Sequence, residues 1–199
     1  SSEFLSEIQR RSRMQINVNV GTFVPKPHTP FQWAPQLPEA VALNRLTGLK
    51  NGMKEQRIQL KYHSPFSSCL EGVIARGDDR VGQIIETAYA KGARLDAWDE
   101  HLNRNLWREV LENCGWDAVG DISRERPLDD HLPWDRINLG VSKNFLKNEF
   151  KKATSSETTE PCAVDCNLNC GICGKKQSVR SNQADELNEE NKEIVSASV

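Results

Sequence analysis

The stretch that decides the fold class is Met14-Gln-Ile-Asn-Val-Asn-Val-Gly-Thr-Phe-Val24. Apolar and polar side chains alternate along it, and one face collects Met14, Ile16, Val18, Val20 and Val24. A period of two with β-branched residues predicts a half-buried strand. The next segment, Pro25-Lys-Pro-His-Thr-Pro-Phe-Gln-Trp-Ala-Pro35, should end that strand, because prolines fix φ and remove backbone donors.

Outward from this strand, the patterns are mostly helical. Glu3–Arg11 is helix-like, Pro38–Lys54 is expected to be a helix with Pro38 in its first turn, and Arg57–His63 is expected to be a second short strand. Four more helices are predicted. The first begins at Cys69, after a capping box formed by Ser68 and Glu71. The second has an inner face made of Val81, Ile84, Ile85, Ala88 and Tyr89, and the third spans Leu102–Leu111. The fourth is introduced by Pro133, and its inner face consists of Val141, Phe145, Leu146 and Phe150. We expect Gly92 and Gly115 to end two of them.

Strand, helix, strand and then helices form an α/β pattern. Two strands alone make a poor sheet, because their edges need neighbours. A complete (β/α)8 barrel takes about 250 residues, more than the 199 of this chain. We therefore expect the missing strands in residues outside the chain or in a partner, and interpret the chain as the later part of a longer protein.

Composition excludes several classes of protein. The 26 basic and 28 acidic residues give a net charge of −2, so no strong field favours general nucleic-acid or membrane-surface binding. No apolar run approaches the roughly 20 residues that cross a bilayer, and Ser1–Arg13 lacks the pattern of a signal peptide. A soluble, cytoplasmic protein is expected.

Four thiols are concentrated near the end of the chain, at Cys162, Cys166, Cys170 and Cys173. Four thiolates suit tetrahedral zinc or an iron–sulfur cluster. Two disulfides are the alternative, which a reducing cytoplasm disfavours. Cys69 and Cys114 lie within helical patterns and are expected to be small buried hydrophobes. After the four terminal cysteines, Ser181–Val199 is acidic, poor in aromatic residues and expected to be disordered.

Residues Val18-Asn-Val-Gly-Thr-Phe-Val-Pro-Lys-Pro-His-Thr-Pro-Phe-Gln-Trp33 resemble the late barrel strand and following loop of radical SAM proteins with a cobalamin-binding domain. Later stretches resemble one uncharacterised branch of that group: Cys69–Arg80, Gly92–Trp98, Leu132–Asp135, Gly140–Leu146 and the terminal cysteines. The resemblance implies four parts: 1–65 as the end of a partial (β/α) radical SAM barrel, 66–153 as a mainly helical extension, 154–180 as a four-cysteine metal-binding segment, and 181–199 as a disordered tail.

The same resemblance implies the chemistry. In the full-length protein a [4Fe-4S] cluster would cleave S-adenosylmethionine (SAM) and start radical chemistry on a substrate that the sequence does not identify, and cobalamin could be a further cofactor. The cysteines of that cluster would precede Ser1, so the chain alone should be inactive. Cys166-x3-Cys170-x2-Cys173 itself has the spacing of a catalytic radical SAM motif. We interpret it as structural or auxiliary, because Cys162 completes a closed shell of four thiolates and no barrel can follow.

Candidate pocket residues lie on and after the first strand. The aliphatic face should pack against outer helices, which directs Asn17 and Asn19 into the barrel. Barrel sites form at the carboxyl ends of strands, where Thr22, Lys26, His28, Thr29 and Gln32 follow. Alternatively, the prolines only shape a rigid loop and Lys26 and His28 face solvent. No catalytic residue can be assigned from the sequence.

A second charged group comprises Arg76-Gly-Asp-Asp-Arg80 with Arg94, Asp96 and Asp99. Its arginines could clamp a carboxylate or phosphate. The interpretation that we favour is a helix start, in which Asp78 and Asp79 cap the Val81 helix. Four tryptophans are expected to be core anchors: Trp98, Trp107, Trp116 and Trp134.

The competing hypothesis is a zinc-knuckle module that binds RNA or a protein. Lys175, Lys176 and Arg180 are the only basic residues beside the cysteines, and the acidic tail would repel phosphate, so nucleic acid is disfavoured. A third interpretation is a scaffold whose cysteines only fold the tail.

Overall fold

The structure is a computed structural model that describes residues 2–12, 14–54, 58–162 and 169–172. The chain forms two compact units. The first holds Ser1–Pro27 and Phe31–Asp135, and the second holds His28–Pro30 and Arg136–Val199. Each unit is described by itself below.

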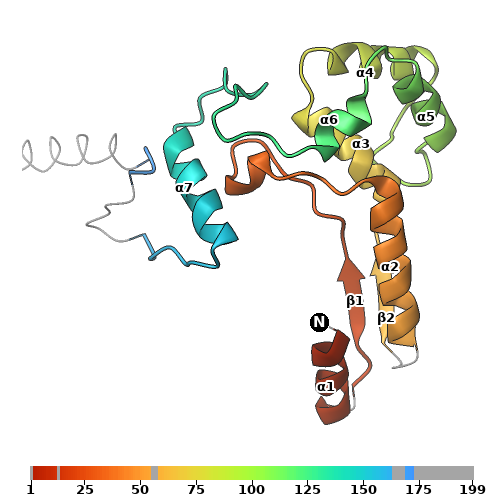
Figure 1. Cartoon of the computed structure of the whole chain (residues 1–199). Coiled ribbons are helices and arrows are strands. Elements are labelled where there is room, and N and C mark those ends of the chain that lie inside the picture. Colours follow the sequence, from red (N-terminus) through yellow and green to blue (C-terminus); the bar gives the residue numbers. More distant parts are fainter. Residues whose placement is uncertain (1, 13, 55–57, 163–168, 173–199) are drawn as a thin grey trace, which may run out of the picture. The chain divides into compact units, whose positions relative to one another are not determined.

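A β–α–β element forms the beginning of the first unit. Strands β1 (Asn17–Val20) and β2 (Gln59–Tyr62) are parallel neighbours, and helix α2 (Glu39–Lys54) lies between them in the chain and alongside β2 (Figure 1). Parallel strands need such a crossover, because a tight turn can join only antiparallel strands. The register aligns Asn17 with Gln59 and Asn19 with Lys61. In the described part of the chain the sheet consists of these two strands, so each has one edge without a neighbouring strand.

The two faces of this small sheet differ in character. One face is apolar: Met53 of α2 packs with Ile58 and Leu60, and the cluster also includes Leu5, Ile16, Val18, Val20 and Tyr62. Leu5 comes from α1 (Ser2–Ser12), which therefore covers part of the same cluster. The alternation of strand side chains places the polar residues on the opposite face.

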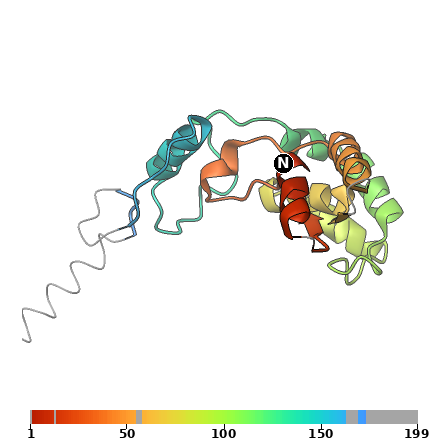
Figure 2. The ribbon, with the colours of Figure 1, turned by 90° about the horizontal axis from the view of Figure 1, so that it is seen from below.

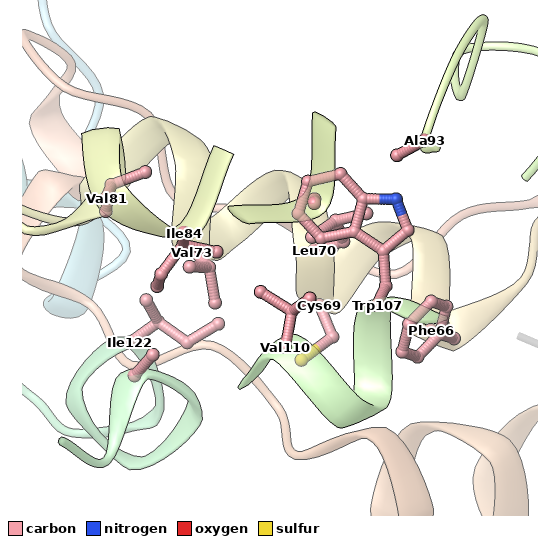
Figure 3. Packing of buried hydrophobic residues seen from close by; sticks show 12 residues of the cluster. Phe66, Cys69, Leu70, Val73, Val81, Ile84, Ala93, Trp107, Val110 and Ile122 are labelled. Atoms are coloured by element: carbon pink, nitrogen blue, oxygen red, sulfur yellow. The ribbon is translucent and has the colours of Figure 1, made fainter. Parts of the chain in front are cut away.

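Four helices form the larger core of the first unit: α3 (Pro65–Arg76), α4 (Val81–Ala90), α5 (Arg104–Glu112) and α6 (Ala118–Ser123). Val73, Ile84 and Ile122 lie together between three of them, and Trp107 lies over the part formed by Leu70 (Figure 3). Figure 2 shows the same helices grouped together from below. Each large apolar side chain buried here contributes roughly 1.5–3 kcal/mol, which makes this cluster the main source of stability.

The segment after β1 is fastened to that core. It includes the short 3₁₀ helix η1 (Pro30–Trp33), and Trp33 is completely buried. The carbonyl of Trp33 accepts from the backbone N–H of Arg126 at 2.9 Å, and the N–H of Gln36 donates to the carbonyl of Ile122 at 3.2 Å. The proline-rich segment is therefore a packed part of the unit from Trp33 onward.

The second unit is built around α7 (Lys143–Thr154). Ser142 is its N-cap, and the hydroxyl accepts from the N–H of Phe145 at 3.5 Å. Beyond the helix, Thr159 donates to a carboxylate oxygen of Glu149 at 2.6 Å and accepts from Lys152 at 3.1 Å. These contacts hold the segment after α7 against the helix.

Several predicted elements are confirmed, with shifted ends. The helices near 3–11, 38–54, 81–90 and 102–111 and the strand near 57–63 are present. Positive φ values of 102° at Gly92 and 82° at Gly115 follow α4 and α5, as expected for glycines that end helices. The strand predicted over 14–24 is only four residues long, because its hydrogen-bonded partner β2 spans four residues.

Other local predictions are wrong. The capping box at Ser68 is absent, since α3 already begins at Pro65 and Ser68 lies inside it. The last helix begins at Lys143 rather than near Pro133, and of its expected inner face only Leu146 is fully buried. Ile85, Tyr89 and Trp98 are exposed, and α6 was not anticipated.

The described residues therefore form a mixed, mostly helical protein with one small parallel sheet. None of its described helices combines the length and the apolar character that crossing a bilayer requires.

Candidate functional site

The polar face of the sheet brings together two of the predicted site residues. Asn17 and Asn19 are exposed on β1, and their register partners Gln59 and Lys61 are exposed on β2. Residues two apart on a strand are roughly 6.6 Å apart, so three carboxamides and one ammonium share a small surface. Gln59 and Lys61 were not among the predicted site residues, although the alternation Ile58-Gln-Leu-Lys-Tyr62 carries the same period of two.

Lys26 forms an ion pair with a residue of helix α3. Its ammonium forms an ion pair with the carboxylate of Glu71 on α3. Both side chains remain about half exposed, so the pair contributes little to stability. It does fix where the loop after β1 meets the helical core. This pairing also explains why Glu71 does not serve the predicted capping box.

Gln32 is an interior residue. Its side chain is 2 % exposed, and its Oε1 accepts from the indole Nε1 of Trp134 at 2.6 Å. Its backbone carbonyl accepts from Nη2 of Arg76 at 3.2 Å. The amide therefore satisfies a buried tryptophan, and Gln32 holds the loop in place instead of lining an open pocket.

Thr22 and His28 occupy different units. Thr22 is partly buried in the first unit, and its hydroxyl has no hydrogen-bond partner among the described residues. His28 and Thr29 belong to the second unit, and His28 has a φ of 56°. A left-handed backbone costs a non-glycine residue on the order of 1 kcal/mol. A single pocket formed by all the predicted loop residues is therefore not a feature of either unit.

The charged group around Arg76 is dispersed. Arg76 is completely buried, and its guanidinium donates to backbone carbonyls of Ile122 and Gln32. Burial is the largest effect on it and lowers its pKa to about 10, with the nearby Arg126 charge acting in the same direction. Asp121 accepts from Arg126 at 2.8 Å and partly balances these charges. Arg76 is thus an internal brace and not an exposed anion clamp.

The other two arginines of that group lie in separate local contacts. Arg80 pairs with Asp78 at 2.8 Å, which lowers the pKa of that carboxyl through the hydrogen bond, and its guanidinium lies 4.0 Å from the centre of the Trp116 ring. The N-cap of α4 is Arg80, without a side-chain cap, so the predicted capping by Asp78 and Asp79 is wrong. Arg94 folds over Tyr89, with 3.4 Å from the guanidinium carbon to the ring centre.

The predicted metal site is described only in part. Cys162 is exposed and Cys170 is half-buried, whereas Cys166 and Cys173 lie outside the described residues. The described ranges alone contain no group of three or more metal-binding side chains. The carbonyl of Cys170 accepts from the N–H of Ser142 at 2.7 Å, which joins this turn to the start of α7.

Gly171 explains the shape of that turn. Its φ is 92°, and a Cβ atom there would meet the carbonyl oxygen of Gly140 at 2.5 Å. Only glycine combines this backbone with so close an approach. The residue beside Cys170 is therefore suited to the tight turn that clustered thiolates need.

The other two cysteines are structural. Cys69 lies in the helical core, where burial and then the charge of Glu39 raise the pKa of its thiol to about 11. Cys114 is half-buried, with its sulfur 3.1 Å from the carbonyls of Leu111 and Trp116. Both agree with their predicted place among packed side chains. A thiol that burial keeps neutral, like that of Cys69, is a poor nucleophile.

Comparison with protein-family models, curated proteins and solved structures returns no match for the chain. The fold and the site therefore define only a class: a mostly helical α/β chain with a parallel β–α–β element, a polar sheet face and a cysteine-bearing turn.

Proposed function

We propose that this chain is the C-terminal part of a radical SAM enzyme, with β1–α2–β2 at the end of a partial (β/α) barrel. The observation that supports it is the β–α–β element itself, with its polar face opposite α2. Among the described residues, each of its two parallel strands has one edge without a neighbouring strand. Parallel sheets are normally covered on both faces, and a two-stranded one is not stable by itself. Further strands at the free edge of β1 would turn the polar face into the inside of a partial barrel, with β2 as its last strand.

The polar face suits the binding of a small molecule. Asn17, Asn19 and Gln59 each offer a donor and an acceptor, and Lys61 adds a positive charge. Inside a barrel these groups would orient a ligand and its substrate near the carboxyl ends of the strands. In the full-length protein the [4Fe-4S] cluster would supply the electron that cleaves SAM.

The terminal cysteines would hold a second metal site. Cys162, Cys166, Cys170 and Cys173 provide four thiolates, and Gly171 supplies the turn beside one of them. Four thiolates fit zinc or an auxiliary iron–sulfur cluster and leave no open position for SAM. Such a site would stabilise the segment after α7.

The decisive experiment uses the full-length protein, purified without oxygen and loaded with iron and sulfide. We expect it to convert SAM to 5′-deoxyadenosine, and to keep doing so when Cys166, Cys170 and Cys173 are all changed to alanine. Cys114→Ser is the matched cysteine control. Loss of SAM cleavage in the triple variant alone would make Cys166–Cys173 the catalytic motif. A reading frame without another C-x3-C-x2-C before Ser1, together with no SAM cleavage, would reject the proposal.

A zinc-knuckle module predicts a different result. The isolated chain would then contain one zinc and no iron, would lack iron–sulfur absorption, and the full-length protein would not cleave SAM. Zinc with intact SAM cleavage would instead reject only the auxiliary-cluster part of the proposal.

A further inference from the structure

A groove of about 750 Å³ runs along β2 in the first unit. Its walls come from α1, the residues before β1, the end of α2 and β2 itself, and they include Gln9, Met14, Lys50, Lys54, Gln59 and Lys61. The groove is thus distinct from the polar face, although Gln59 and Lys61 belong to both.

The groove is positively charged. Lys50, Lys54 and Lys61 line it, and none of the described residues lining it is acidic. No described residue forms an ion pair with any of these three ammonium groups, although Lys50 lies 5.6 Å from the centre of the Tyr62 ring. Lys50 and Lys54 are one turn apart on the same side of α2, where like charges repel each other. An anionic partner would relieve that repulsion.

The backbone of β2 adds a second feature. The N–H of Gln59 donates to the carbonyl of Ile16 at 3.0 Å, so the peptide groups of Gln59 face β1. Backbone groups alternate in direction along a strand, which turns those of Leu60 and Tyr62 toward the other edge of β2, where no described residue forms a neighbouring strand. Such an edge is a template for another extended segment.

The lysine spacing matches an extended chain. Four residues of an α-helix advance about 6 Å, and two residues of a strand advance about 6.6 Å. A strand beside β2 could therefore place acidic residues at positions i and i+2 opposite Lys54 and Lys50. The residue between them would point to the other face, toward Gln59 and Lys61.

We propose that the edge of β2 binds an extended acidic segment of a partner protein as a third strand, with carboxylates on Lys50 and Lys54. A second copy of this chain does not fit, because its own three lysines would face the same charges. A phosphate-bearing ligand could neutralise the lysines but would leave the Leu60 and Tyr62 backbone groups unused. The groove would serve this partner whether or not the chain belongs to a radical SAM enzyme.

The test uses the full chain and a short fluorescent peptide in which valine and glutamate alternate. We expect salt-sensitive binding, and slower hydrogen exchange at the amides of Leu60 and Tyr62 when the peptide is bound. Changing Lys50 and Lys54 to glutamine should weaken binding about fivefold. The matched control is Lys147→Gln with Lys151→Gln, which removes two lysines at the same spacing from α7 and should leave the affinity unchanged.

A charge reversal distinguishes a loss of charge complementarity from a loss of structure. The Lys50→Glu, Lys54→Glu variant should no longer bind the glutamate peptide, but it should bind a peptide in which valine alternates with lysine. The proposal would be overturned if the peptide bound equally well to the Lys50→Gln, Lys54→Gln variant and to the unchanged chain. Binding without protection of Leu60 and Tyr62 would also overturn it, as would lysine-dependent binding of a short RNA with no binding of the peptide.

Discussion

Arg76 donates a hydrogen bond from Nη1 to the backbone carbonyl of Ile122 at 2.9 Å, across 46 positions of the chain. The same guanidinium donates to the carbonyl of Gln32 at 3.2 Å, and the carbonyl of Arg76 accepts from Arg126 at 3.2 Å. One buried side chain at the end of α3 thus joins the loop after β1 to α6. Through the carbonyl of Gln32, Arg76 positions the proline-rich segment 25–35.

Arg76→Leu should therefore destabilise the protein strongly. The substitution leaves the buried carbonyls of Gln32 and Ile122 without their donor, and we expect a loss of about 3 kcal/mol in the free energy of unfolding. Urea denaturation followed by tryptophan fluorescence measures it. Arg45→Leu, at an exposed position of α2, is the control and should change the midpoint little. Equal effects of both substitutions would contradict the role of the brace.

Two helical glycines should respond in opposite directions to alanine. A Cβ atom on Gly72 would collide with the side chain of Gln36 and lie 2.9 Å from Cδ1 of Ile122, so Gly72→Ala should cost about 1–3 kcal/mol. Gly48 in the middle of α2 has open space around it, and Gly48→Ala should stabilise by about 0.5–1 kcal/mol. Thermal unfolding of the two variants compares these predictions directly.

The buried thiol of Cys69 should make stability depend on alkaline pH. Burial raises its pKa from 9.0 to about 11, so the folded state favours the neutral thiol. This stabilisation is complete below about pH 9 and is lost as the pH rises through 11, by up to roughly 2 kcal/mol. The difference in unfolding free energy between the wild type and Cys69→Ala should shrink over that range. A constant difference would show that the thiol does not titrate there.

Asn103 should contribute a measurable N-cap to α5. Its side-chain oxygen accepts from the N–H of Leu106 at 3.1 Å. Asn103→Ala removes that acceptor and should cost about 1 kcal/mol, whereas Asn103→Asp keeps an acceptor at the same place and should cost much less. Chemical denaturation distinguishes the two, and similar losses for both would argue against capping.

Metal content provides the check on the terminal cysteines. We expect Cys170→Ala to remove most of the metal bound by the chain, because a tetrahedral site needs all four thiolates. Cys114→Ala should keep it, since that thiol lies beside α5 in the other unit. Elemental analysis of the purified variants gives the result, and retained metal in the Cys170 variant would exclude this site.

Local patterns predicted the elements better than their ends. The alternation in Met14–Val24 correctly indicated a strand, but β1 extends only as far as β2 can pair with it. The Ser68–Glu71 pattern matches a capping box, but α3 begins one turn earlier at Pro65, and the carboxylate of Glu71 pairs with Lys26. The length of β1 was thus set by a strand distant in the sequence, and the start of α3 by the local signal of Pro65.

Burial was harder to predict than secondary structure. Trp107 and Trp134 are core residues as expected, whereas Trp98, Ile85 and Tyr89 of the same apolar patterns are exposed. The brace of Arg76 and the interior position of Gln32 had no sequence signal at all, because charged and amide residues are usually on the surface. Only the partners that the fold supplies make their burial tolerable.

The sequence by itself determined the period-two strands, the amphipathic helices, the glycines that end them and the set of four thiols, because each depends on backbone geometry within a few neighbouring residues. The tertiary structure decided that Asn17 and Asn19 share a face with Gln59 and Lys61, that Lys26 pairs with Glu71, and that Arg76 is an internal brace. These relationships join residues some 40 positions apart, and only the packing of helices and strands around a common core brings such residues within hydrogen-bonding distance.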